Sequence, residues 1–198
     1  MIPACNLDTI EQTLSYRHNY GEKYIIGIMF ARYDIALSQD MINECYRYWH
    51  ELSDKDFDMF WLGYGEYGCE NHNDNPIEMT FPGNNTYNYF NTRKYIDSIR
   101  EIKALTGGKW KYNDKIQLML VNCRRGSIDL SEYITIDLEE NLGENNSNLR
   151  QLVYNIIEYS RSYSDVRQIK LLLRRDSFWR SLKSITLSDA LSFLSFMK

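Results

Sequence analysis

Long apolar runs, prolines and glycines are scarce in this chain of 198 residues, and each shortage excludes a class of protein. No apolar stretch approaches the roughly 20 residues that a membrane-spanning helix needs, so we expect no membrane contact. Three prolines and ten glycines leave little room for long linkers, which favours one domain, with or without a helical appendage. The N-terminus has no basic segment followed by an apolar run, so the sequence predicts a soluble, cytoplasmic protein.

Paired cysteines and catalytic signatures are also missing. The four cysteines, at positions 5, 45, 69 and 123, show no paired spacing and are expected to be free thiols in a reducing compartment. Cys69 and His72 have the spacing of half a zinc site, but no second pair completes four ligands, so no metal is predicted. With three histidines and no Gly-x-Ser-x-Gly, the sequence favours a protein without catalytic residues or a cofactor.

Tyrosine and charge, in contrast, are distributed unusually. The 16 tyrosines hint at a contact surface, although a bias toward Tyr, Asn and Ile codons is an alternative explanation. Residues 151–198 hold eight Lys and Arg against four Asp and Glu, which leaves 15 and 23 in residues 1–150. The chain therefore has an acidic body and a basic C-terminal region, and this asymmetry concerns partners more than fold.

One stretch, residues 23–63, determines the expected fold class. A nearly continuous apolar run at 23–31 predicts a strand that is buried on both faces. An amphipathic helix at 38–52 and a second apolar run at 57–63 follow, and this order is typical of two parallel strands joined by a crossover helix. The sequence therefore predicts an α/β fold.

Hydrophobic periodicity places the other elements. Asp8 and Glu11 form a capping-box pattern at the start of a helix. The predicted helices are 7–20, 89–105, 149–159, 165–183 and 188–197, and the predicted strands 116–122 and 132–138 form an antiparallel pair. Residues 64–85 are polar and are expected to lack regular structure.

The resulting order, β-α-β-α-β-β-α, resembles a thioredoxin-type layout with added helices. That family carries a Cys-x-x-Cys or a single reactive Cys just after the first strand, where this chain has residues 32–36, Arg-Tyr-Asp-Ile-Ala. A proline expected before the third strand is also missing, because Asp114 and Lys115 stand there, so no redox function is predicted. We expect a domain at 1–143 with a mixed four-stranded sheet, and a helical region at 144–198 packed on the same core.

Polar side chains follow the carboxyl ends of the two parallel strands, where ligands bind in such sheets. Arg32 suits an anion, the tyrosines can stack, and the carboxylates are acid or base candidates. The ligand-binding candidates are Arg32, Asp34, Tyr64, Glu66 and Tyr67. In the alternative interpretation, Arg32 pairs with Asp34 or Glu66 and the loop is merely solvated.

One motif match lies beside these candidates. Residues 63–68 read Gly-x-Gly-x-x-Gly directly after the second parallel strand. The following residues, 69–76, do not open a helix whose N-terminus could face a pyrophosphate, so we expect no dinucleotide site.

The basic segment 165–183 is the stronger functional signal. Arg167, Lys170 and Arg174 share a helical face that could bind an acidic protein surface or nucleic-acid phosphates. Alternatively, these charges meet the acidic body of the same chain. The partner-binding candidates are Arg167, Lys170, Arg174, Arg175, Phe178, Trp179, Arg180 and Lys183.

Two functions from different classes follow from these patterns. The favoured one is a soluble interaction or accessory module of a bacterial multi-protein assembly, which docks another protein through its C-terminal basic and aromatic helices. The alternative is a small-ligand-binding protein or enzyme that uses the carboxyl edge of the two parallel strands. The acidic body argues against general affinity for nucleic acid.

Overall fold

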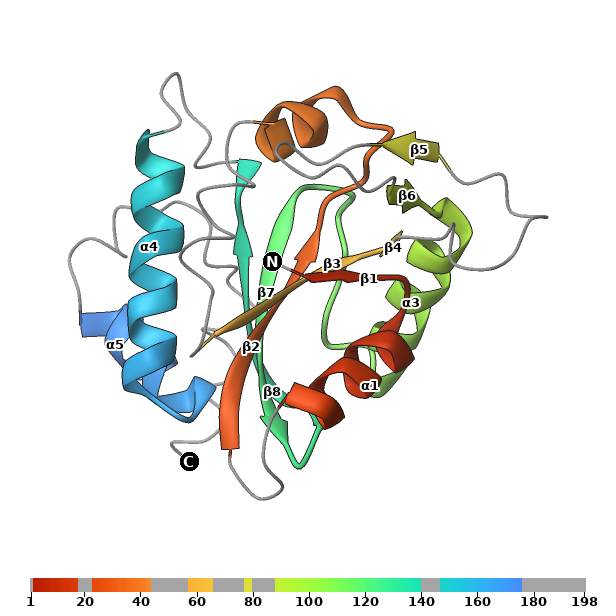
Figure 1. Cartoon of the computed structure of the whole chain (residues 1–198). Coiled ribbons are helices and arrows are strands. Elements are labelled where there is room, and N and C mark those ends of the chain that lie inside the picture. Colours follow the sequence, from red (N-terminus) through yellow and green to blue (C-terminus); the bar gives the residue numbers. More distant parts are fainter. Residues whose placement is uncertain are drawn as a thin grey trace.

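The computed structural model describes residues 2–17, 23–43, 57–65, 77–79, 88–139 and 147–175, and a mixed sheet lies at its centre (Figure 1). Its strands lie in the order β1 (Ile2–Ala4), β3 (Asp58–Leu62), β2 (Lys23–Phe30), β7 (Gln117–Arg124) and β8 (Ser127–Asp137). β1, β3 and β2 run parallel, whereas β2–β7 and β7–β8 are antiparallel pairs. The mixed α/β class, the parallel pairing of β2 with β3 and the antiparallel β7–β8 pair are therefore confirmed.

β1 is a strand that the sequence analysis does not predict, and it gives the described sheet a fifth member. It pairs Ile2 with Phe60 and Ala4 with Leu62 at the edge of the sheet. Three residues are too few to show an alternating pattern, so the strand exists because β3 offers it a parallel edge and not because of local preference.

A second, smaller sheet corrects the expectation that residues 64–85 lack regular structure. It consists of β4 (Tyr64–Gly65), β6 (Asn88–Phe90) and β5 (Ile77–Met79), in that order, with antiparallel pairing. The amide of Asn91 donates to the carbonyl of Gly63 at 2.8 Å, which continues this pairing into the bend between β3 and β4. The strands are two or three residues long, so tertiary pairing decides them.

Helices cover both faces of the central sheet. In Figure 1, α1 (Leu7–Arg17) and α3 (Thr92–Leu105) lie on one side, and α4 (Ser147–Ser162) and α5 (Val166–Arg175) lie on the other. Residues 36–43, after β2, are also helical. α4 and α5 contact β2, β7 and β8 and contribute six buried side chains to the same core: Leu152, Val153, Ile156, Ile157, Val166 and Ile169.

Two local predictions about the helices are wrong. Asn6, not Asp8, caps α1, because its Oδ1 accepts a hydrogen bond from the Thr9 amide at 3.0 Å. Glu11 instead accepts from the amide of Ile128, 2.9 Å away on β8. The apolar pattern of residues 89–105 also predicts that Leu105 is buried, but it is 61% exposed because it lies in the last turn of α3.

The expectation of free thiols is confirmed for Cys123 and wrong for Cys5. Cys123 is a free, buried thiol whose Sγ donates to the hydroxyl of Tyr24 at 3.0 Å. Cys5, however, is disulfide-bonded, because folding and not sequence spacing decides which cysteines meet. Cys45 and Cys69 lie outside the described residues. Disulfides are typical of oxidising compartments, so the disulfide at Cys5 does not support a cytoplasmic location. That location stays a prediction. Within the described part of the chain, no helix has the length and apolarity to span a membrane.

Candidate functional site

The β7–β8 hairpin forms the site at which α5 packs on the sheet. Its tight turn, Arg125-Gly126, has positive φ at both residues, as a two-residue hairpin loop of type I′ requires. Asn122 then pairs with Asp129 but Val121 pairs with Tyr133, so residues 130–132 of β8 have no opposite residue on β7. This bulge interrupts the strand pairing beside Asn122.

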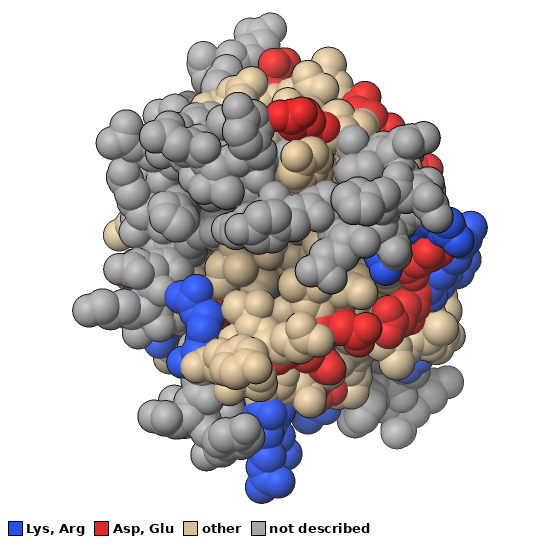
Figure 2. All heavy atoms as spheres, turned by 45° about the vertical axis from the view of Figure 1, so that its right-hand side comes forward, with Lys and Arg blue, Asp and Glu red and all other residues tan. Residues whose placement is uncertain are grey.

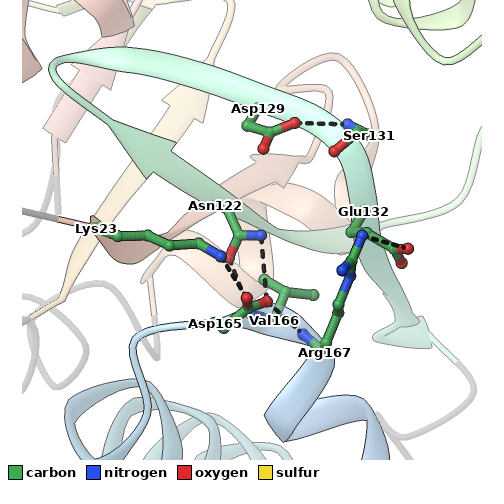
Figure 3. A network of polar contacts seen from close by, with 8 residues as sticks. All are labelled: Lys23, Asn122, Asp129, Ser131, Glu132, Asp165, Val166 and Arg167. Carbon is green, nitrogen blue, oxygen red and sulfur yellow. Dashed lines mark hydrogen bonds and ion pairs between the residues drawn. The ribbon is translucent and has the colours of Figure 1, made fainter.

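Asn122 uses its side chain to hold the beginning of α5 (Figure 3). It is only 3% exposed, and its Oδ1 accepts a hydrogen bond from the Val166 amide at 2.9 Å. Its Nδ2 lies 3.4 Å from Oδ1 of Asp165. The first amides of a helix have no acceptor within the helix. Asn122, on the sheet, therefore supplies the acceptor that the Val166 amide lacks within α5.

Asp165 completes this anchor from the other side. Its Oδ1 accepts from the amide of Arg167 at 2.9 Å, the geometry of an N-cap, and its carboxylate forms an ion pair with Lys23 on β2. Burial raises the pKa of Asp165, but hydrogen bonds from Lys23, Arg167 and Asn122 outweigh it and leave the pKa below its ordinary value. The folded state therefore favours the charged carboxylate.

This lowered pKa predicts how the anchor depends on pH. A carboxylate with a lower pKa in the folded than in the unfolded state stabilises the fold above the unfolded pKa, about 3.9, and loses this contribution as the pH falls through the folded value. We expect Asp165→Asn to lower the unfolding free energy at pH 7 by up to about 1 kcal/mol, because the pair is partly exposed. Urea unfolding as a function of pH tests this: the difference from wild type should shrink toward zero at strongly acidic pH, and a constant difference would contradict it.

Beyond its anchored end, α5 places the predicted partner-binding residues in unequal positions. Val166 and Ile169 are buried, whereas the Arg167 side chain is 66% exposed and Leu171 is 56% exposed. Arg167 Nη2 lies 3.3 Å from Oε1 of Glu132, in the bulge of β8 (Figure 3). Lys170 is half-buried, so the exposed face of α5 consists mainly of Arg167 and Leu171.

The remaining candidates of this set lie outside the described part of the chain. They are the side chains of Arg174 and Arg175 and the whole of Phe178, Trp179, Arg180 and Lys183. Leu171 is an exposed residue of α5 that was not among the predicted candidates. The run of three leucines at 171–173 could have indicated it, because a helix that packs on one face cannot bury three consecutive positions.

At the carboxyl edge of the parallel strands, Arg32 is already paired. Its Nε lies 3.0 Å from Oδ1 of Asp34 and its Nη2 lies 2.5 Å from Oδ2, a bidentate contact. The hydrogen bond to Asp34 raises the pKa of Arg32. This geometry agrees with the alternative interpretation of the pair, in which Arg32 is neutralised by its own loop.

Tyr64 packs beneath this edge. It is fully buried, and its hydroxyl donates to the carbonyl of Ala31 at 2.5 Å. Burial raises its pKa well above the ordinary value, so it remains a neutral phenol. Its ring centroid lies 5.0 Å from that of Phe90 and 5.6 Å from that of Trp61, as in a packed aromatic core. Glu66 and Tyr67 lie outside the described residues.

Two other tyrosines at this edge were missed by the sequence analysis. The hydroxyls of Tyr95 on α3 and Tyr112 lie 2.6 Å apart. Burial raises the pKa of Tyr112 to about 12 and that of Tyr95 further, so both are neutral hydrogen-bonding groups at neutral pH. Tyr112 lies in a polar stretch without periodicity, which gave no signal. The small-ligand hypothesis for this edge stays a prediction.

Neither metal ligands nor known relatives identify the protein. No group of three or more His, Cys, Asp or Glu side chains could hold a metal ion within the described ranges, and Cys69 and His72 lie outside them. Comparison with protein-family models, with curated proteins and with solved structures gives no match.

Proposed function

We propose that this chain is an interaction or accessory module of a multi-protein assembly and docks a partner protein through the exposed face of α5. The observation that carries the proposal is the exposure of Leu171 beside Arg167 on a helix that is fixed to the sheet. Arginine is enriched in protein interfaces, and the exposed leucine one turn away adds apolar area to the same face of the helix. The anchor at Asn122 and Asp165 holds the helix, so little conformational entropy is lost on binding.

The charge of the chain favours a protein over nucleic acid as the partner. The formal net charge is −4, and the acidic residues are concentrated before residue 151. A nucleic acid that approached the chain would meet its net negative charge, and this repulsion would weaken binding at physiological salt. A protein can place its acidic groups only opposite the basic face of α5, which limits that repulsion.

We also propose a thioredoxin-type layout with C-terminal helices added. Support comes from the parallel β1–β3–β2 unit with α1 and the helical residues 36–43 between its strands, and from α3 followed by the antiparallel β7–β8 hairpin. The small sheet β4–β6–β5 is then an insertion between β3 and α3, and α4 and α5 are the extension. Arg32 and Asp34 occupy the position of the family's reactive cysteine, so the layout serves here as a scaffold.

Leu171→Asp is expected to abolish partner capture while leaving the protein folded. The tagged chain, incubated with extract of its source cells, should retain a specific protein, which can be an untagged copy of the chain itself. A charged group at the centre of an apolar contact costs several kcal/mol, enough for a loss of more than roughly a hundredfold in affinity. Quantitative mass spectrometry of the retained proteins measures the effect.

The matched control is Leu37→Asp, because Leu37 is also an exposed leucine on a helix but lies after β2. This variant should retain the same partner as wild type. Equal capture by wild type and Leu171→Asp, or equal loss in both variants, would refute a specific role of α5.

A further inference from the structure

α3 carries a surface that is complementary to that of α5. Glu101 and Leu105 are four residues apart and lie on one face of the helix. Glu101 is exposed and has no ion-pair partner within the described part of the chain, and Leu105 is 61% exposed. α3 therefore presents an unpaired carboxylate and an apolar side chain one turn apart.

The carboxylates near Glu101 favour the approach of a cationic side chain. Burial raises the pKa of Glu101, and the neighbouring carboxylates of Asp8 and Glu11 on α1 raise it further. Figure 2 turns this side of the molecule toward the viewer, and Asp and Glu side chains gather there in a band. Like charges that crowd one another in this way are relieved when a guanidinium or ammonium group approaches.

α5 presents the opposite charge with the same spacing. Arg167 and Leu171 are also four residues apart, and both are more than half exposed. Arg167 lies 3.3 Å from Glu132 through one nitrogen. A guanidinium has five N–H donors, so the exposed ones remain available for a second carboxylate.

The two surfaces cannot meet within one molecule, because α3 and α5 lie on opposite sides of the central sheet (Figure 1). We propose that α5 of one copy docks on α3 of a second copy, with Arg167 facing Glu101 and Leu171 facing Leu105. The inference rests on the proposed function, in which α5 binds a protein, and it names a second copy of the chain as that protein. Different patches meet in such a contact, so it is head-to-tail and produces open chains or closed rings.

Two blocked variants test the geometry of this contact. Leu171→Asp removes the α5 surface but leaves α3 intact, and Leu105→Asp does the reverse. In analytical ultracentrifugation at low salt, wild type should form species that grow with concentration, and each variant alone should be monomeric. An equimolar mixture of the variants should form dimers and nothing larger, because it retains one α5 surface and one α3 surface that match.

The ionic component is tested with neutral substitutions. Arg167→Gln and Glu101→Gln should each shift the wild-type assembly toward monomers, and the double variant should lose no more than either single variant. Raising the salt from about 0.05 M to about 0.5 M should weaken assembly of wild type much more than of the double variant. Additive losses would mean that these two residues do not contact each other.

Failure of this inference differs from failure of the proposed function. If wild type is monomeric at high concentration and low salt, the second copy is refuted. Loss of capture of another protein by Leu171→Asp would then still support docking through α5. If the variant mixture does not dimerise and Leu171→Asp captures the same proteins as wild type, both are refuted.

Discussion

Gly63→Ala is expected to lower the unfolding free energy by roughly 2–5 kcal/mol, which is a large share of the stability of a typical domain. Gly63 has φ +86°, a conformation that costs an L-residue about 1–2 kcal/mol. A Cβ at this position would also lie 2.8 Å from the Phe90 ring and 2.9 Å from Cβ of Tyr95. Neither neighbour can retreat, because both rings belong to the packed aromatic core around Tyr64.

The control for this prediction is Gly107→Ala. Gly107 also has positive φ, +62°, but nothing lies within 4 Å of its added Cβ. Only the backbone cost applies there, about 1–2 kcal/mol. Urea unfolding of both variants separates strain from steric overlap, and equal losses would show that the contact with Phe90 and Tyr95 is unimportant.

Gly63 also has a structural role that accounts for one glycine of the motif match. It is the first glycine of the Gly-x-Gly-x-x-Gly match, and its positive φ turns the chain from β3 into β4. Its amide donates to the carbonyl of Ala4 at 2.8 Å, which ties β1 to this bend. Glycine is required here by a bend and a close approach, two reasons that need no phosphate.

Long periodic segments could be predicted from the sequence because their pattern repeats over several turns or strand residues. β2, β3, β7 and α3 begin and end within a few residues of the expected positions. β1, β4, β5 and β6 could not be predicted, since strands of two or three residues carry no period. They depend on which edge is available to pair with, and that is decided only when the sheet is complete.

The candidate site was predictable in part for the same reason. Arg167 could be found because basic residues recur in the segment at helical spacing. Asn122 could not, because it lies in an apolar run that reads as a strand and its role depends on a register shift with β8. A buried asparagine in such a run is itself a signal, since it needs partners for its amide group and those partners must come from another element.

The exposed docking face of α5 depends on the contacts that fix the helix to the sheet. Val166 and Ile169 bury one side of the helix, and the network around Asp165 fixes its first turn against β7 and β8. Arg167 takes part in the anchor and in the docking face, because its amide donates to Asp165 while its exposed guanidinium contacts Glu132. A substitution that releases the anchor should therefore weaken docking at Leu171 without touching the docking face.

Asn122→Ala is the substitution that tests this dependence, and we expect it to lower the unfolding free energy by about 2 kcal/mol. The change leaves the buried amide of Val166 without its acceptor and removes the hydrogen bond from Asn122 Nδ2 to the Asp165 carboxylate. Hydrogen exchange of the α5 amides should accelerate more than exchange in β2 or β7, because the helix end is released first. Asn43→Ala, at an exposed position, should change stability by less than about 0.5 kcal/mol.

A double-mutant cycle completes this test. Asn122 and Asp165 hold the same helix terminus, so Asn122→Ala and Asp165→Ala together should cost less than the sum of the two single changes. Partner capture should fall in Asn122→Ala although Leu171 and Arg167 are unchanged, because binding must then also order the helix end. Additive losses with unchanged exchange in α5 would show that Asn122 stabilises the sheet alone, and the docking face would then depend only on its own exposed side chains.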